Sequence, residues 1–198
     1  MTANLSAFFN TYCGKMCLIN CVVEKIMQLQ PTLSGELIII RPLRSDDFEP
    51  LYQAASDPLI WELHPEPLRY TRSVFQKYFD GGIASKGAFA VIDLKTGDTI
   101  GSSRYTDYNP IEKTVEIGYT FLARKYWGGK YNRELKRLML EHAYKWVDAV
   151  RFFVGDKNFR SQAAQKKIGS VLIGSIEDGR GVSLIFELSK ANASSILI

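Results

Sequence analysis

Hydrophobic and polar residues follow a helical rhythm in the stretch that begins near residue 132. Apolar residues spaced by three or four positions are Leu135, Leu138, Met139, Ala143, Trp146 and Val147. The intervening charged residues are Arg133, Lys136, Arg137, Glu141 and Lys145. This spacing predicts an amphipathic helix with one buried face. Asn132 is a favourable N-cap for it, and Glu134 suits the positive end of the helix dipole.

A strand pattern comes directly before this helix. Residues 114–122 are rich in β-branched and aromatic side chains, as is typical of a strand. Gly118 interrupts that run, which indicates a bulge or a close approach of another group to the backbone. Trp127, Gly128 and Gly129 then form a break before the helix. A strand, a glycine turn and a helix start together present backbone N–H groups to an anion, so this stretch predicts an anion site.

Similar patterns divide the rest of the chain. The further predicted strands are residues 36–41, 89–94, 100–105, 150–154, 171–175 and 182–188. The further predicted helices are 45–55, 71–85 and 158–168, with Ser45 and Asn158 as N-caps. The order of these elements predicts an α+β fold, with a mixed, mainly antiparallel central sheet flanked by helices.

The first 30 residues differ in character from the remainder. They carry few charges and only a weak helical pattern over 8–29, and they fit a secretory signal poorly. We interpret residues 1–30 as an N-terminal extension outside the core fold and residues 31–198 as a single domain. An upstream start codon is one origin for the first 26 residues, because Met27 suits a native start.

Composition narrows the class of protein. The chain has 198 residues, of which 46% are hydrophobic and 23% charged, as in a soluble globular domain. Its net charge of +4 is mild and scattered, which favours a small anionic ligand over nucleic acid. No apolar run reaches the length of about 18 residues that spans a membrane. We therefore expect no nucleic-acid partner and no membrane partner.

The three cysteines lie close together, at Cys13, Cys17 and Cys21. An odd number in one short stretch does not make a disulfide framework, so we expect a reducing, cytoplasmic location. Their spacing fits neither a common zinc pattern nor an iron–sulfur pattern. We interpret them as small apolar residues on a helix face, with a metal or redox role as the alternative.

Several common catalytic patterns are missing from the sequence. The only histidines are His64 and His142, with no Glu-x-x-His pair, so we expect no metal site. There is no Gly-x-Ser-x-Gly nucleophile motif and no phosphate-binding Gly-x4-Gly-Lys-Ser/Thr loop. The glycines at 128 and 129 do not form a dinucleotide-binding fingerprint. The predicted anion site therefore remains as the main indication of function.

Four stretches in a fixed order supply a family resemblance. They are Leu37-Ile-Ile-Ile-Arg41-Pro42-Leu43, Glu116-Ile-Gly-Tyr-Thr-Phe-Leu122, Trp127-Gly-Gly-Lys-Tyr-Asn132, and Asn158-Phe-Arg-Ser161 followed by Lys167-Ile-Gly169. Together with the element order, they resemble the GNAT superfamily of N-acetyltransferases over about residues 34–190. The subgroup that they resemble most is the ribosomal-protein N-terminal-alanine acetyltransferases. The resemblance implies that 31–198 is an N-acetyltransferase domain.

The resemblance implies acetyl-CoA as the acetyl donor and a primary amine as the acceptor. The strand residues implied to lie along the pantetheine arm are Ile117, Tyr119, Phe121 and Leu122. The residues implied around the pyrophosphate are Lys125, Trp127, Gly128, Gly129, Lys130, Tyr131 and Asn132. Asn158 is implied to contact the pantetheine or the region of the thiol. Lys130 stands where the family prefers a glycine, so it can add a phosphate contact.

The resemblance also suggests the groups that manage protons. Glu116, on the strand beside the thioester, is the candidate base, acting through a water molecule. The family's frequent tyrosine acid is replaced by Gln165, and Ser161 stands where the ribosomal-protein subgroup has a serine acid. Backbone N–H groups of the strand can polarise the carbonyl. Aromatic candidates for the acceptor pocket are Trp61, Tyr70, Tyr105 and Tyr119, for which core packing is the alternative.

Three questions stay open at the level of sequence. The acceptor is a small-molecule amine or a protein N-terminus, and a homodimer is compatible with the chain. The rival function is an acyl-CoA-binding regulatory module without catalytic activity, because the tyrosine is absent and the loop is altered.

Overall fold

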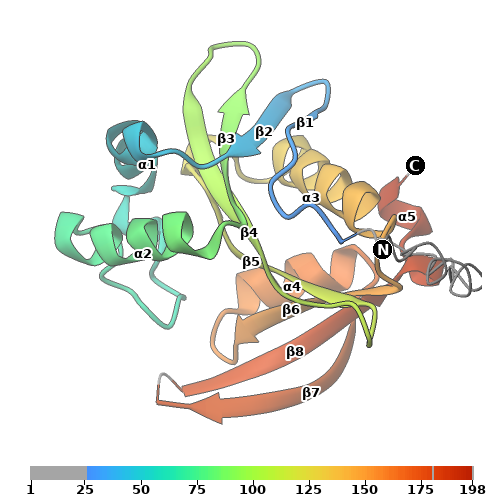
Figure 1. Ribbon diagram of the computed structural model, residues 1–198. Helices are drawn as coiled ribbons and strands as arrows, with labels where there is room; N and C mark the ends of the chain where they lie inside the picture. Colours follow the sequence, from blue (N-terminus) through green and yellow to red (C-terminus); the bar gives the residue numbers. More distant parts are fainter. Residues whose placement is uncertain (1–25, 180, 198) are drawn as a thin grey trace, which may run out of the picture.

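The computed structural model describes residues 26–179 and 181–197 (Figure 1). The predictions for Cys13, Cys17 and Cys21 and for a helix up to residue 25 fall outside these residues. No helix in the described residues is long and apolar enough to cross a bilayer.

One mixed sheet forms the centre of the described fold. Its eight strands lie in the order β1-β2-β3-β4-β5-β6-β8-β7. β5 and β6 run parallel, and the other neighbouring pairs are antiparallel. The strands are β1 Leu33–Ser34, β2 Ile38–Pro42, β3 Ala88–Asp93, β4 Thr99–Asn109, β5 Thr114–Leu122, β6 Ala149–Gly155, β7 Val171–Asp178 and β8 Gly181–Ser189. The predicted mixed, mainly antiparallel sheet of an α+β fold is confirmed.

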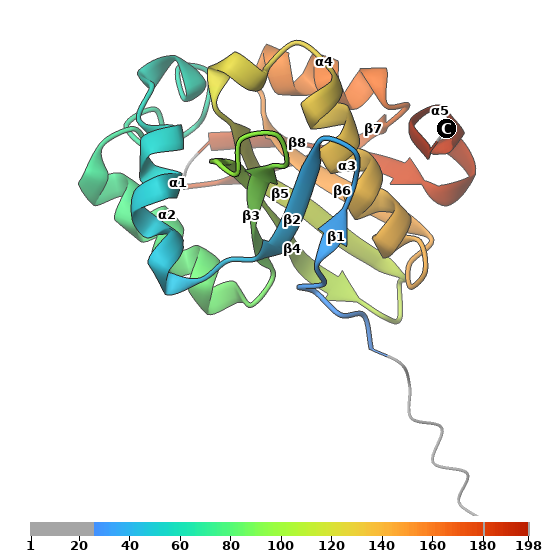
Figure 2. The same cartoon turned by 90° about the horizontal axis from the view of Figure 1, so that it is seen from above.

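Helices cover both faces of this sheet. They are α1 Phe48–Ala55, α2 Arg72–Ser85, α3 Lys130–Ala143, α4 Phe159–Lys167 and the short α5 Ser194–Leu197. α1 and α2 lie on one side of β4 and β5, and α3 and α5 lie on the other (Figures 1 and 2). Residues of β3 alternate between two cores, as expected of a strand covered on both faces. Phe89 and Val91 pack in the core that contains α3, whereas Ala88 and Ala90 pack in the core of α1 and α2.

The last residues of the predicted extension belong to the packed domain. Met27 is only 3% exposed and lies in the α3 core. A ring nitrogen of His142 lies 2.8 Å from the carbonyl oxygen of Gln28. Residues 26–29 carry no helix, in contrast to the weak helical pattern. Met27 and Gln28 are therefore packed against the domain.

Helix boundaries differ from the prediction at two N-caps. α3 begins at Lys130 with Gly129 as its N-cap, so Asn132 lies inside the first turn. Ser45 belongs to a short 3₁₀ turn that precedes α1, and its N-cap is Arg44. Asn158 is confirmed as the N-cap of α4, since its side chain accepts a hydrogen bond of 3.1 Å from the Ser161 N–H.

Candidate active site

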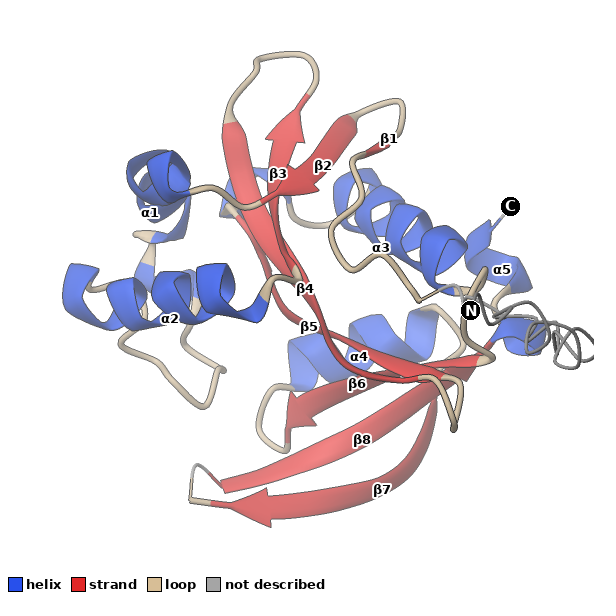
Figure 3. Ribbon diagram, in the orientation of Figure 1, coloured by secondary structure: helices blue, strands red, loops and turns tan. Residues whose placement is uncertain are grey.

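β5 separates from its parallel neighbour half-way along its length. It pairs with β6 only over residues 114–116, although it continues to Leu122. Beyond this point β6, β8 and β7 fan away from β4 and β5 (Figure 3). The edge of β5 that faced β6 is thereby available to an extended ligand, as the resemblance implied for a pantetheine arm.

A bulge in β5 lies at the point of separation. Arg104 of β4 lies opposite Gly118, but Ser102 lies opposite Phe121, so β5 contains one extra residue between them. Ile117 packs in the α3 core and Phe121 in the α1 and α2 core, which shows that the strand changes face. Tyr119 has a φ of +54° within this bulge. The interpretation of Gly118 as a bulge marker is confirmed.

A cleft of about 1810 Å³ runs past this bulge. Its lining includes parts of residues 60–69, of α2 and of β5, together with the starts of α3 and α4. It brings together twelve of the predicted site residues: Glu116, Ile117, Tyr119, Phe121, Leu122, Trp127, Gly128, Gly129, Lys130, Asn132, Asn158 and Ser161. These come from β5, the loop after it, α3 and α4, so the fold gathers segments that are far apart in sequence.

Two predicted cofactor residues do not line this cleft. The Lys125 ammonium lies 3.8 Å from the Asp98 carboxylate, beside a separate small hollow. The Tyr131 hydroxyl donates a 3.4 Å hydrogen bond to Asp93. Their side chains therefore do not join the other ten cofactor candidates. Lys125 lies in the short 3₁₀ turn after β5 and Tyr131 in the first turn of α3, and both side chains point toward the Asp93 and Asp98 hairpin.

The aromatic candidates for the acceptor pocket divide in the same way. Trp61 and Tyr119 line the cleft. Tyr105 is buried in the α3 core, where its hydroxyl donates a hydrogen bond to the Met139 carbonyl oxygen. Tyr70 packs against the α1 and α2 core.

The end of the cleft at α3 has the features of a phosphate site. Gly128 has a φ of +80°, which favours glycine, and Gly129 caps a helix of 14 residues. Backbone N–H groups at such a start and the helix dipole attract anions. Lys130 is exposed at this point and forms no ion pair with any residue that the structure describes. Trp127 is held by a 2.8 Å hydrogen bond from its indole N–H to the Leu122 carbonyl oxygen.

Glu116 lies on the face of β5 that is turned toward α2. It lies opposite Thr106, and on the same face Gly118 lies opposite Arg104. The pKa of the Glu116 carboxyl is raised to about 7: burial is the main cause and the nearby Asp107 acts in the same direction, whereas Thr106 and Arg104 act in the opposite direction. A carboxylate with a pKa near neutrality is suited to accept and release a proton.

Lys136 is a functional candidate that the sequence pattern missed. Its side chain was expected on the polar face of the helix, but it is only 5% exposed and lines the cleft. Its ammonium donates a 3.2 Å hydrogen bond to the Thr120 hydroxyl and lies 5.0 Å from the Phe152 ring centre. Burial lowers the pKa of Lys136 to about 7, and the charge of Glu116 opposes this shift. The spacing of apolar residues in α3 predicts which face packs against the sheet, but it cannot show that another part of the protein also covers the polar face that carries Lys136.

α4 contributes residues to the lining of the cleft. Ser161 is half-buried in its first turn and lines the cleft. Gln165, one turn later, is 5% exposed, and its side-chain oxygen has no hydrogen-bond partner among the described residues. The position of Gln165, where the resemblance places a tyrosine, was the signal that could have marked it as a site residue.

No group of three or more His, Cys, Asp or Glu side chains in residues 26–179 and 181–197 is arranged to hold a metal ion.

Comparison with known proteins identifies a family. The model of the acetyltransferase (GNAT) domain matches residues 38–171. No curated protein matches the chain.

Solved structures share the fold. A GCN5-related N-acetyltransferase from Brucella melitensis has a TM-score of 0.75 at 17% identity, with 85% of this chain and 82% of that chain covered. RimJ of Mycobacterium smegmatis, solved with CoA-disulfide, has a TM-score of 0.66 at 17% identity, covering 85% and 93%. A spermidine N-acetyltransferase from Vibrio cholerae, solved with CoA and spermine, has a TM-score of 0.62 at 15% identity, covering 81% and 99%.

Proposed function

The chain belongs to the GNAT acetyltransferase family and is an acyltransferase, and from this premise we propose that it transfers an acetyl group from acetyl-CoA to a primary amine by direct attack. The observation that carries the proposal is Glu116, a carboxyl group with a pKa of about 7 beside the separated strands. Two of the structural relatives were solved with CoA or its disulfide, which supports this choice of donor.

The residues present fit acetyl-CoA as the donor. The unpaired edge of β5 after Glu116 offers backbone groups to the amides of an extended arm. Gly128, Gly129 and the start of α3 offer N–H groups to the pyrophosphate, and Lys130 adds a positive charge. When bound, acetyl-CoA supplies an activated thioester. Positioning of that thioester beside an amine is itself a large part of catalysis in this kind of reaction.

Glu116 is the proposed base. An amine attacks a carbonyl carbon only after it has lost its extra proton, and Glu116 accepts this proton through a water molecule. Gly118 leaves room for the Glu116 carboxylate against the strand, because a Cβ atom at position 118 would meet its Oε1. We assign polarisation of the carbonyl group to backbone N–H groups of β5.

Ser161 is the proposed proton donor to the departing thiolate. It lies in the first turn of α4, where the helix start favours negative charge. Gln165 has no acidic proton, but its amide N–H₂ can donate a hydrogen bond to sulfur from the next turn of α4. We therefore assign proton donation to Ser161 and only a positioning role to Gln165.

The test combines binding and turnover on the full chain. We expect acetyl-CoA to raise the melting temperature and labelled acetyl groups to reach members of a primary-amine library, with release of a free thiol. Ser161→Ala should lower kcat while the stabilisation by acetyl-CoA persists. Absence of stabilisation at millimolar acetyl-CoA would contradict the proposal. Stabilisation without thiol release for every amine would instead favour the CoA-binding regulatory module.

A further inference from the structure

Two arginines line the cleft beside α2. Arg104 belongs to β4 and is 6% exposed, and Arg69 is half-buried in the segment before α2. The role proposed for Glu116 and the start of α3 uses neither of them. Both side chains are cationic at neutral pH, so their surroundings need an explanation.

Aromatic rings and neutral groups hold these guanidinium groups in place. The Arg69 guanidinium carbon lies 4.9 Å from the Tyr78 ring centre and 5.0 Å from that of Trp61. The Arg104 guanidinium carbon lies 5.7 Å from Tyr78 and 4.1 Å from Tyr119. Such stacking fixes the plane of a guanidinium and leaves its N–H edge to recognise another group.

The hydrogen bonds of the pair leave part of that edge unused. Arg104 donates from Nη2 to the Tyr78 carbonyl oxygen at 3.3 Å, and Arg69 Nη1 lies 3.2 Å from His64 Nε2. The Nε atoms of both arginines are buried and have no hydrogen-bond partner among the described residues. A buried donor without an acceptor costs free energy unless a ligand supplies the acceptor.

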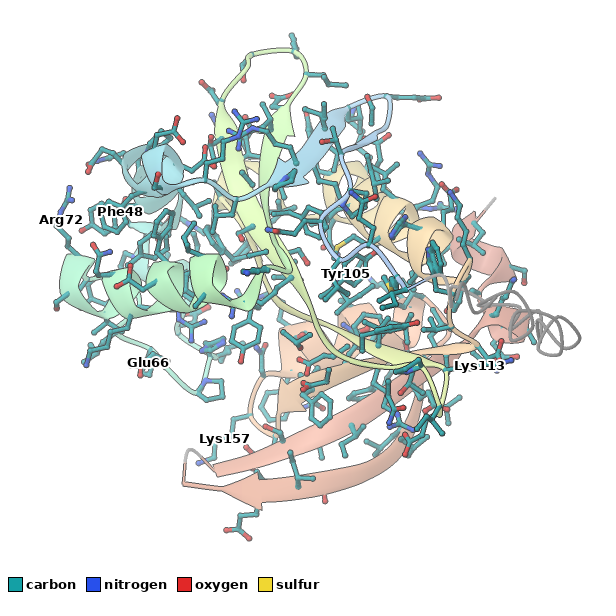
Figure 4. All side chains as sticks on the ribbon, in the orientation of Figure 1. Phe48, Glu66, Arg72, Tyr105, Lys113 and Lys157 are labelled. Atoms are coloured by element: carbon teal, nitrogen blue, oxygen red, sulfur yellow. The ribbon has the colours of Figure 1, made fainter. Side chains whose placement is uncertain are left out.

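No described carboxylate forms an ion pair with either arginine. Burial lowers the pKa of Arg69, the charge of Arg104 lowers it further, and Tyr78, Glu66 and Tyr119 act in the opposite direction. Glu66 itself is exposed, in the loop below α2 (Figure 4). Two like charges are thus held close together in a cleft, and neither guanidinium group forms a direct ion pair with a described carboxylate.

Arg72 shows what a purely structural arginine looks like in the same helical region. It also stacks on aromatic rings, at 4.6 Å from Tyr52 and 5.4 Å from Phe48, at the outer end of α2 (Figure 4). However, Arg72 has its own counter-ion, because its Nη2 lies 2.7 Å from the Glu49 carboxylate. Arg69 and Arg104 have the stacking without the carboxylate.

The arginine pair lies within reach of the proposed base. Arg104 and Glu116 project from the same face of the sheet, on neighbouring strands and one diagonal step apart. Diagonal neighbours in an antiparallel pair lie about 7–8 Å apart, and their Cβ atoms are somewhat closer. One small molecule, or the first residues of one peptide, can therefore contact both groups.

We propose that the acceptor amine also carries an oxyanion, a carboxylate or a phosphate monoester, and that Arg69 and Arg104 bind this group while Glu116 faces the amine. This inference rests on the proposed function, because it names the class of acceptor for the same cleft. Guanidinium groups recognise both kinds of oxyanion through paired N–H bonds, so the experiment has to distinguish them.

The experiment uses pairs of amines that differ in one group. The carboxylate arm compares 4-aminobutanoate with 4-aminobutanamide, and the phosphate arm compares O-phosphoethanolamine with ethanolamine. We expect one anionic member to have a kcat/KM at least about tenfold above its neutral partner, as for a charge-assisted contact. The arm with the larger ratio identifies the oxyanion. The same four compounds are tested for thermal stabilisation of the protein, which requires no turnover.

Variants connect the preference to the arginines. Arg104→Met should reduce the ratio of anionic to neutral kcat/KM to near one. Because Arg104 is deeply buried and its loss can affect folding, the half-buried Arg69 is replaced in a second variant, Arg69→Met, with the same expected result. Arg72→Met is the matched control, since it removes a stacked arginine outside the cleft, and it should keep the ratio. Thermal stabilisation by acetyl-CoA in each variant shows that the donor site is intact.

The outcomes separate this inference from the proposed function. Equal use of both members in both pairs, or an equal preference in Arg69→Met and the wild type, would overturn the oxyanion proposal while acetyl transfer stands. If no compound is acetylated, equal stabilisation by anionic and neutral members would overturn it as well. Failure of acetyl-CoA itself to bind would contradict the proposed function, and the stabilisation by the four amines would still decide the oxyanion site.

Discussion

The carboxylate of Glu116 occupies the space that a Cβ atom on Gly118 would need. Only the end of a flexible side chain would clash, and Gly118 does not have a positive φ. Gly118→Ala should therefore fold but displace the proposed base. A displacement of about 1 Å can cost about 100-fold in rate, so we expect kcat to fall by at least tenfold.

Steady-state kinetics with thiol detection checks this prediction. Gly174→Ala in β7 is the matched control, because nothing described lies near a Cβ atom at that position. A Gly118→Ala protein with wild-type kcat would show that the position of Glu116 is unimportant.

The pH dependence of the reaction should report the ionisation of Glu116. Its pKa is raised to about 7, mainly by burial. The carboxylate accepts a proton only when it is ionised, so kcat/KM should rise as the pH increases through about 7. Glu116→Gln should lower kcat/KM by about 100-fold or more and remove this limb. The control Glu141→Gln, on the outer side of α3, should keep the wild-type kcat/KM and its rise with pH. If Glu116→Gln still shows the same rise with pH, the ionisation belongs to another group.

Lys136 should influence that same limb. The charge of Glu116 raises the pKa of Lys136, and the coupling of two charges is reciprocal. Lys136→Met therefore removes a cation that favours ionised Glu116, and the apparent pKa of the limb should increase. The exposed Lys145→Met is the control. A role in packing alone would change kcat or stability without moving this pKa.

Much of the fold follows from local patterns. The helix predicted over 71–85 is α2, 72–85, and the cap at Asn158 is present, because turn chemistry and apolar spacing act within a few residues. The helix start at Lys130 was missed. Gly129 is the N-cap of α3, although Asn132 has the stronger intrinsic preference for that position, so capping preference alone predicted the wrong first residue of the helix.

The candidate site was only partly predictable, because its charges depend on contacts between distant segments. Glu116 came from its place on a strand that resembles the family. No sequence pattern predicted a role for Lys136, Arg69 or Arg104, because a charged residue is expected to be exposed to solvent unless its neighbours in space are known. Burial beside β5 and α2 makes these residues candidates for function.

Lys130 and Lys125 provide a test of the donor site. Both lysines are exposed, Lys125 in the segment after β5 and Lys130 at the start of α3, but only Lys130 lines the cleft, whereas Lys125 lies beside Asp98. Lys130→Ala should weaken acetyl-CoA binding by about two- to fivefold, as for an exposed ion pair. The difference should shrink at high salt because ions screen the phosphates. Calorimetric titration at low and high salt measures both effects, with Lys125→Ala expected to bind like the wild type.

Glu134 should be important for stability and not for chemistry. It was expected to favour the helix dipole, but its carboxylate accepts backbone N–H bonds of 2.7, 2.8 and 2.9 Å from Glu36, Leu37 and Ile38. It thereby joins α3 to the start of β2. Glu134→Ala leaves these donors without an acceptor, so the free energy of unfolding should fall by about 1–3 kcal/mol or more in urea. Glu141→Ala, which removes a surface ion-pair partner of Arg137 on the same helix, should change it by less than about 1 kcal/mol. Equal effects of the two substitutions would show that the three hydrogen bonds contribute no more than a surface contact.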